Sequence, residues 1–236
     1  MMIQRFADAA RQQPFLRAGV LTCRRWRARA NDAVLGIATD PYDLCPWLRD
    51  EHGPYTCDPI DYVLARRLVR TVDLRPGDVV YDLGCGLGRI ICLAAQYPVR
   101  HCVGVELSEV LANGACENAE RLRGRQSRID ILQADAATLD YSDATVIFLC
   151  NPFGVEVLSV VLEGIQDSLR RRPRDLRIGY ANPIHDDVLK QCDWLERYRQ
   201  DASLFHERPT SFWRSMASAV ACRGKSTQGE MLEAAA

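Results

Sequence analysis

The chain has little lysine, no long hydrophobic run and no paired-cysteine motif. Lys190 and Lys225 are the two lysines among 30 basic residues, which we interpret as a coding bias. No window reaches the ~18 consecutive apolar residues that a transmembrane helix requires, and the N-terminus lacks the apolar core of a signal peptide. These absences argue against a membrane partner. The formal net charge of −1 gives no reason to expect nucleic acid as a partner.

The ten cysteines form no Cys-x-x-Cys pair, and most of them lie within apolar segments, as Cys92 and Cys102 do. A free cysteine packs as a small hydrophobic residue. The four histidines are scattered along the chain. We therefore expect a cytoplasmic, reducing setting, with no disulfide framework and no bound metal.

The length of 236 residues suits one α/β domain with an extension. We expect a helical and lid extension over residues 1–57, a ligand-binding domain over 58–223 and a flexible tail over 224–236. Residues 1–35 are rich in arginine and helix-like, and residues 39–59 are rich in proline, glycine and aromatics. The basic helix is interpreted as docking onto the domain. A surface for an acidic partner and a targeting segment are the alternatives.

Strand and helix patterns alternate after residue 58. A helix is expected from Asp58-Pro59 to about Thr71, with Ile60, Val63, Leu64 and Leu68 on its apolar face. The expected strands cover residues 79–83, 102–106, 129–133, 145–150 and 176–180. The expected helices cover residues 89–96, 109–122, 155–171 and 185–191, and residues 194–200 and 215–222 are expected to form an antiparallel edge pair. This pattern predicts a seven-stranded, mostly parallel, doubly wound α/β sheet with helices on both faces.

A glycine loop follows the first of these strands. Gly84, Gly86 and Gly88 are spaced G-x-G-x-G, whereas a dinucleotide fingerprint has G-x-G-x-x-G/A. Such a loop lets backbone N–H groups approach a ligand closely. Asp82 precedes the loop, and its negative charge would repel a pyrophosphate. The loop therefore suits a ligand that carries positive charge.

Two further acidic residues follow the next two strands. Glu106 ends the second strand, 18 residues after Gly88, where it can reach the hydroxyls of a ribose. Asp135 follows the third strand, and its alternative role is a helix N-cap. All three loops leave the carboxyl ends of adjacent parallel strands, where open α/β sheets bind ligands.

In order and spacing, the pattern from Asp58 to Cys222 resembles the class I S-adenosylmethionine (SAM) methyltransferases, which have a Rossmann-like sheet. The resemblance implies SAM as the cofactor, and it implies that Asp135 accepts a hydrogen bond from the adenine amine. The residues that it assigns to cofactor binding are Asp82, Gly84, Cys85, Gly86, Gly88, Glu106, Leu107, Asp135, Ala136 and Asn151.

The segment Asn151-Pro152-Phe153 follows the fourth strand, where this family binds its methyl acceptor. It resembles the Asn/Asp-Pro-Pro-Tyr/Phe motif of amino methyltransferases and the Asn-x-Phe of lysine methyltransferases without a SET domain. The resemblance implies that Asn151 and the Pro152 carbonyl accept hydrogen bonds from the nucleophilic nitrogen, and that Phe153 stacks on the acceptor. This chain has one proline where the first motif has two, so its loop is shorter. A structural Asn-Pro turn is the alternative.

Three more residues are candidates for binding the acceptor. Tyr55 and Thr56 belong to the segment before the first strand, which often crosses the cofactor in this family. Asn182 begins a second Asn-Pro pair after the fifth strand.

We expect a SAM-dependent methyltransferase that acts on a nitrogen of a protein side chain or a small molecule. Displacement at a sulfonium needs mainly alignment, and the sequence shows no strong general base. The alternatives are an NAD(P)-dependent oxidoreductase and a SAM-binding module without catalysis. A nucleic-acid acceptor is disfavoured, because basic residues cluster only in the N-terminal segment and at 170–174. The sequence leaves the oligomeric state open.

Overall fold

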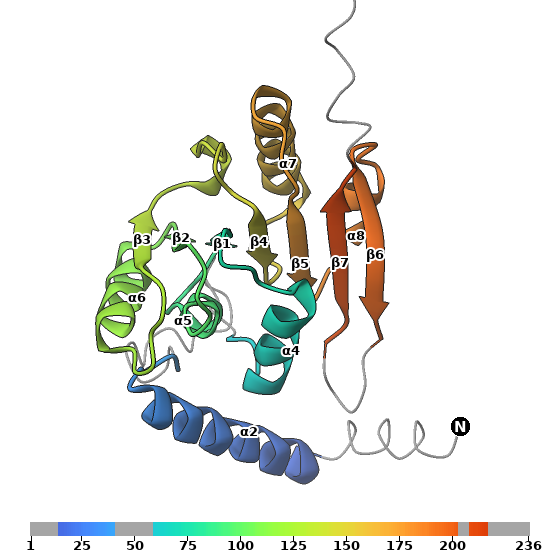
Figure 1. Ribbon diagram of the computed structural model, residues 1–236. Helices are drawn as coiled ribbons and strands as arrows, with labels where there is room; N and C mark the ends of the chain where they lie inside the picture. The colour runs from blue at the N-terminus through green and yellow to red at the C-terminus, as the bar shows by residue number, and fades with distance from the viewer. Residues whose placement is uncertain (1–13, 41–58, 203–207, 217–236) are drawn as a thin grey trace, which may run out of the picture.

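The computed structural model describes residues 14–40, 59–202 and 208–216. Within these residues, seven strands form one sheet with helices on both faces (Figure 1). The strands are β1 (Val79–Leu83), β2 (His101–Glu106), β3 (Ile129–Gln133), β4 (Val146–Leu149), β5 (Arg177–Ala181), β6 (Leu195–Asp201) and β7 (Thr210–Ser215). Their order across the sheet is β3-β2-β1-β4-β5-β7-β6. Strands β1 to β5 are parallel and β7 is antiparallel to both of its neighbours, which confirms the predicted fold class.

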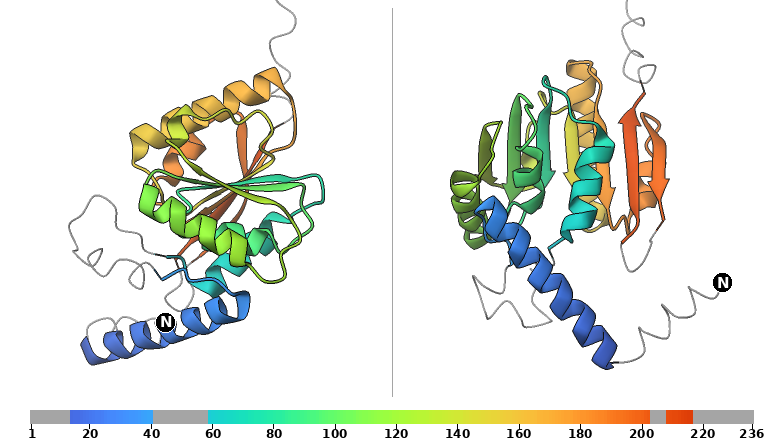
Figure 2. Two further views of the ribbon diagram at one scale, coloured as in Figure 1. Left: turned by 90° about the vertical axis from the view of Figure 1, so that its left-hand side faces the viewer. Right: turned by 60° about the horizontal axis from the view of Figure 1, so that its bottom comes forward.

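Helices cover both faces of the sheet. They are α2 (Pro14–Leu35), α4 (Tyr62–Val72), α5 (Arg89–Ala94), α6 (Glu109–Arg121), α7 (Val155–Arg171) and α8 (Asp186–Lys190), with a short 3-10 helix, η2 (Ala136–Thr138). Figure 2 shows α6 and α7 on opposite sides of the sheet, and α2 lying outside it. No described helix is long and apolar enough to cross a membrane.

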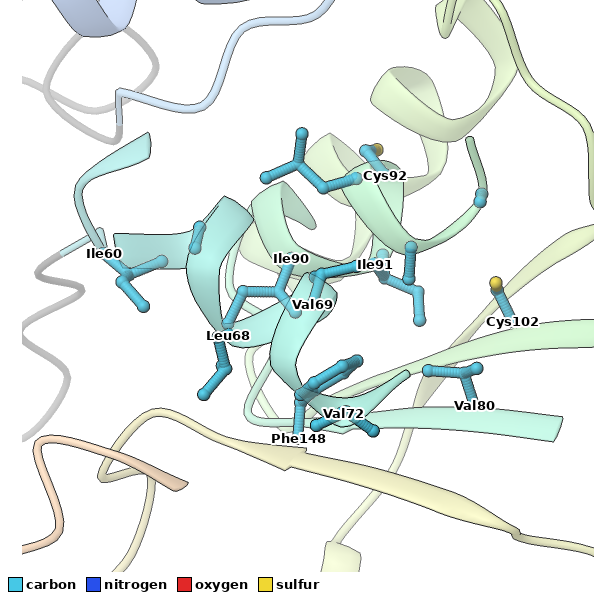
Figure 3. Packing of buried hydrophobic residues seen from close by; sticks show 14 of the residues in the cluster. Ile60, Leu68, Val69, Val72, Val80, Ile90, Ile91, Cys92, Cys102 and Phe148 are labelled. Atoms are coloured by element: carbon cyan, nitrogen blue, oxygen red, sulfur yellow. The ribbon is translucent and has the colours of Figure 1, made fainter. Parts of the chain in front are cut away.

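Side chains of the central strands point alternately to the two faces of the sheet, and they form one apolar layer on each face. In β1, Val80 faces the cluster under α4 and α5, whereas Val79 and Tyr81 face the cluster under α7. Figure 3 shows the first cluster, in which Val69 of α4 and Ile91 of α5 lie on the same side of the sheet as Val80. All residues of β1 and β4 are buried, as expected for strands covered on both faces.

The start of α4 differs from the prediction. Asp61 is the N-cap, and its Oδ1 accepts a hydrogen bond from the Val63 N–H at 2.8 Å. The helix therefore begins at Tyr62, three residues later than the Asp58-Pro59 cap would place it, and Asp58 lies outside the described residues. The buried stripe consequently includes Leu64 and Leu68, as predicted, but not Val63, which is 44% exposed.

The edge pair also differs in part. Strand β6 covers nearly the predicted range, but its partner β7 is Thr210–Ser215 and not 215–222. The reason is that Phe212 and Trp213 are buried in the sheet, where they pack into the two apolar layers. Residues 217–222 lie outside the described residues, as do 1–13, 41–58 and the tail 224–236. The expected domain boundaries therefore stay a prediction.

Candidate active site

A cleft of about 540 Å³ opens at the carboxyl ends of the central parallel strands. This volume is in the range of small-molecule sites. The predicted residues that line it are Asp82, Gly84, Cys85, Gly86, Glu106, Leu107, Asp135, Ala136, Asn151, Pro152 and Phe153. Gly88 and Asn182 are not among the lining residues, and Tyr55 and Thr56 lie outside the described part of the chain. Within that part, no group of three or more potential ligands is placed to hold a metal ion.

The glycine loop depends on a left-handed backbone and on the absence of side chains. Gly84, Gly86 and Gly88 have φ of 71°, 55° and 82°, a region that side-chain-bearing residues rarely adopt. A Cβ at Gly84 would also lie 2.5 Å from the Cβ of Pro152. Gly88 is the N-cap residue of α5, so it shapes the turn behind the cleft wall.

Glu106 is held in place by backbone N–H groups. Leu83 pairs with Val105 in the β1–β2 register, so the next residue of β2 lies beside the glycine loop. Its Oε2 accepts from the Gly86 N–H at 2.9 Å, and its Oε1 accepts from the Ser108 N–H at 3.0 Å. Because a carboxylate offers about four lone-pair sites, it retains acceptor capacity for ligand hydroxyls.

Asp82 is a buried carboxylate that no cation of the described residues pairs with. It is 1% exposed, and its Oδ2 has no hydrogen-bond partner. The pKa of Asp82 is raised to about 7: burial is the largest cause, the nearby charge of Glu106 adds to it, and a backbone hydrogen bond from Ile91 opposes both. Such a group is costly to keep ionised unless a cation or a donor approaches it. The cleft therefore suits a ligand with a positively charged group.

Asp135 serves as an N-cap in this structure. Its Oδ1 accepts from the Ala137 N–H at 2.9 Å at the start of η2. The side chain is exposed and also lines the cleft. Because the cap uses Oδ1, Oδ2 can accept a second hydrogen bond.

The segment Asn151-Pro152-Phe153 forms a turn in the wall of the cleft, next to the glycine loop. Asn151 has φ of 49°, and the buried Tyr180 hydroxyl donates to its Oδ1 at 3.4 Å. Phe153 packs partly against the apolar layer under α7. The segment is thus a structured turn whose residues face the cleft, so the structural and functional interpretations are compatible.

Residues 80–171 match the protein family described as "Methyltransferase domain". The matched segment, which runs from β1 to α7, is therefore similar to a methyltransferase domain. This bears out the resemblance seen in the sequence.

Curated relatives agree on the domain and differ in what they act on. A protein-lysine N-methyltransferase of Saccharolobus islandicus is 38% identical over 97 residues, covering 41% of this chain and 58% of the relative. A phosphoethanolamine N-methyltransferase of Triticum aestivum is 37% identical over 81 residues, covering 34% of this chain and 15% of the relative. The chain therefore spans less than two thirds of both relatives.

A solved structure shows the same fold. An RNA methyltransferase from Salinibacter ruber, in complex with S-adenosyl-L-homocysteine, superposes with a TM-score of 0.50 at 22% identity. The match covers 67% of this chain and 94% of the other.

The cleft has a further wall that the sequence did not reveal. Thr39, from the N-terminal extension, and Ile60, which lies just before α4, line the cleft together with Arg89. Arg89 is 5% exposed and donates three hydrogen bonds: Nε to Thr39 Oγ1 at 2.7 Å, Nη2 to the Thr39 carbonyl at 3.1 Å, and Nη1 to the Ile60 carbonyl at 2.5 Å. The available signal was an arginine directly after the third glycine, at the start of an otherwise apolar helix.

Hydrogen bonds from Asn118 of α6 join this wall to the glycine loop. The Asn118 Oδ1 accepts from the Ala38 N–H at 2.8 Å, and its Nδ2 donates to the carbonyls of Ala38 at 2.8 Å and Leu87 at 2.9 Å. Asn118 is buried, so the three bonds are shielded from water. The extension is therefore part of the cleft.

Proposed function

We propose that the protein is a SAM-dependent methyltransferase that transfers a methyl group to a nitrogen of a protein side chain or a small molecule. The observation that carries the proposal is the unpartnered Oδ2 of Asp82, buried beside a glycine loop in the cleft. SAM is a nucleoside with an ammonium group and a sulfonium, and it would supply an electrophilic methyl group. The ammonium would give Asp82 a counter-charge, which none of the described residues supplies.

The other cofactor contacts follow from the same cleft. Glu106 would accept hydrogen bonds from the ribose hydroxyls, because its carboxylate is already aimed by Gly86 and Ser108. The Oδ2 of Asp135 would accept from the adenine amine, since the cap bond uses Oδ1. Leu107 and Ala136 line the cleft near these groups and would contact the adenine ring.

The acceptor would lie against the Asn151 turn. Amide and carbonyl oxygens from Asn151 and Pro152 can accept hydrogen bonds from an amine, which aims its lone pair at the methyl group. Phe153 would pack against the acceptor. The names of two relatives, a protein-lysine and a phosphoethanolamine N-methyltransferase, support nitrogen as the acceptor atom.

Binding measurements test the cofactor first. We expect isothermal titration to show binding of SAM and S-adenosylhomocysteine and no binding of NAD⁺. Binding of NAD⁺ without SAM would instead indicate an oxidoreductase, and it would overturn the proposal.

The acceptor is tested with deuterated SAM and cell extract. Proteins, small molecules and RNA are separated after the reaction and analysed by mass spectrometry. Label on a nitrogen of a protein or metabolite supports the proposal. Label on RNA would contradict the proposed acceptor class, and binding of SAM without any transfer would indicate a non-catalytic module.

A further inference from the structure

Tyr180 is a buried tyrosine that lies behind the Asn151 turn. It is 1% exposed, and it is not among the residues that line the cleft. The β4–β5 register pairs it with Leu149, two residues before Asn151. Its hydroxyl donates to the Asn151 Oδ1 at 3.4 Å, and hydrogen bonds in a ligand-free site are often this long. Tyr180 therefore contacts the cleft wall through the side chain of Asn151.

The Tyr180 hydroxyl is a hydrogen-bond donor at neutral pH. Burial raises the pKa of Tyr180, a backbone hydrogen bond from His185 opposes this shift, and the charge of Asp186 adds to it. The group therefore keeps its single proton, so it acts as a donor and not as a general base. The Asn151 Oδ1 receives this proton.

This hydrogen bond determines which way the side-chain amide of Asn151 faces. The oxygen of an amide accepts hydrogen bonds, and its nitrogen donates them. If the amide were turned over, the buried hydroxyl would face a second donor and its proton would lose its acceptor, which is costly away from water. The oxygen therefore faces Tyr180 with one lone pair, and it keeps the other for a ligand.

The backbone around Asn151 is held by other contacts. Asn151 has φ of 49°, Pro152 lies against Gly84, and Phe153 packs against the apolar layer under α7. These contacts leave the rotation of the Asn151 side chain undetermined. The hydroxyl of Tyr180 supplies that constraint.

We propose that Tyr180 is a positioning residue for methyl transfer, because it holds the Asn151 oxygen where that oxygen can align the acceptor amine. The inference rests on the proposed function and adds to it a residue that touches neither ligand. The aligned amine uses its lone pair to form the new nitrogen–carbon bond, the departing sulfur keeps the electrons of the bond that breaks, and the amine releases its extra proton to water. Packing in the apolar layer under α7 is the competing role of Tyr180.

The test is a double-mutant cycle of Tyr180→Phe and Asn151→Gly. Tyr180→Phe removes one hydroxyl and keeps the ring, so we expect the rate of label transfer from deuterated SAM to cell extract to fall roughly 3- to 10-fold. The affinity for S-adenosylhomocysteine, measured by isothermal titration, should stay unchanged. In the Asn151→Gly background, Tyr180→Phe should cause no further loss of rate. An equal loss in both backgrounds would show a packing role, and no loss in either would show no role, so both results overturn the inference.

Tyr81→Phe is the matched control. Tyr81 lies in the same apolar layer as Tyr180, and its hydroxyl donates to Asp143 Oδ1 at 3.1 Å. Loss of that hydroxyl should leave the rate of label transfer unchanged. A loss of rate equal to that of Tyr180→Phe would show a general packing effect and would contradict the inference.

A second measurement depends neither on activity nor on the folding of Tyr180→Phe. In the ¹⁵N spectrum of the wild-type protein, the side-chain amide of Asn151 is the signal that Asn151→Gly removes. We expect nuclear relaxation to show that this amide is as rigid as the backbone of β5, and a mobile amide overturns the inference. If the wild-type protein transfers no label to the extract, the proposed function fails. If it transfers label at a rate that Tyr180→Phe does not change, only this inference fails.

Discussion

The Cβ of Pro152 lies 2.5 Å from the position that a Cβ would take at Gly84. The glycine loop and the Asn151 turn therefore meet at Gly84, where a side chain on the glycine would clash with Pro152. The contact also explains why a glycine is needed here for space as well as for its φ of 71°.

Gly84→Ala should destabilise the protein and impair binding of S-adenosylhomocysteine. The alanine would face both the left-handed backbone and the Pro152 contact, so we expect a loss of at least about 2 kcal/mol in the free energy of unfolding. Gly77→Ala is the control, since a Cβ there meets nothing within 4 Å. Chemical denaturation of both variants is the measurement. Equal free energies of unfolding for the two variants would show that the loops accommodate the added methyl group, which would contradict the prediction.

Glu106→Gln should weaken the binding of S-adenosylhomocysteine by roughly 10- to 100-fold. The amide nitrogen would face an N–H donor of Gly86 or Ser108, where the carboxylate now accepts. It would also offer one acceptor fewer to the ribose. Glu117→Gln on the exposed face of α6 is the control, and it should leave the affinity unchanged. Equal dissociation constants for both variants would remove Glu106 from the binding site.

Asp82→Asn should stabilise the ligand-free protein at pH 8 by about 1–3 kcal/mol. The pKa of Asp82 is raised from 3.8 to about 7, so between these values the folded protein holds a proton that the unfolded chain has released. Stability from this group is therefore present below pH 4 and is lost as the pH rises towards 7. The advantage of the variant should shrink towards pH 4. Thermal unfolding across this range is the measurement, and a constant difference would contradict the assignment.

The same variant should bind S-adenosylhomocysteine more weakly at pH 8 than the wild-type protein does. The ammonium group favours the ionised carboxylate, so the affinity of the wild-type protein should fall as the pH drops below about 7. Asparagine does not titrate, so its affinity should lose this dependence. Titrations in buffers of different ionisation enthalpy would detect the proton that the wild-type protein releases on binding.

Asn151→Gly should reduce the methyl-transfer rate by about 100-fold without changing the affinity for S-adenosylhomocysteine, because an amine would lose its aligning acceptor. Glycine keeps the φ of 49° accessible, so the turn is preserved. Asn182→Gly is the matched control: it has a φ of 52°, also precedes a proline and lies outside the cleft lining. Label transfer from deuterated SAM is the measurement. A full rate in Asn151→Gly would exclude Asn151 from the reaction.

The parallel strands were predictable because each is an apolar run bounded by turn residues. Strand β3 matches its predicted bounds, and β4 lies within them. The start of α4 was not predictable in this way, since Asp58 and Asp61 are both plausible caps. Asp61 also receives a charged hydrogen bond from Arg27 of α2 at 2.8 Å, and a local pattern does not contain that contact.

In the candidate site, too, the residues with a local sequence signal were predictable, and those that depend on distant contacts were not. The acidic residues and glycines at the strand ends are local signals, and the cleft brings most of them together. The role of Arg89 depends on oxygens of Thr39 and Ile60, which are 50 and 29 positions away. Strand β7 was misplaced because residues 215–222 and 210–215 both contain apolar residues, and only packing of Phe212 and Trp213 distinguishes them.

The hydrogen bonds between Asn118 and Ala38 and between Arg89 and Thr39 determine where a recombinant fragment should begin. A fragment starting at residue 58, the boundary suggested by composition, would leave the amide of Asn118 and the guanidinium of Arg89 facing water. Its cofactor cavity would be open on one side. Recombinant fragments and chimaeras that are meant to keep the cavity intact must therefore begin upstream of Asp32.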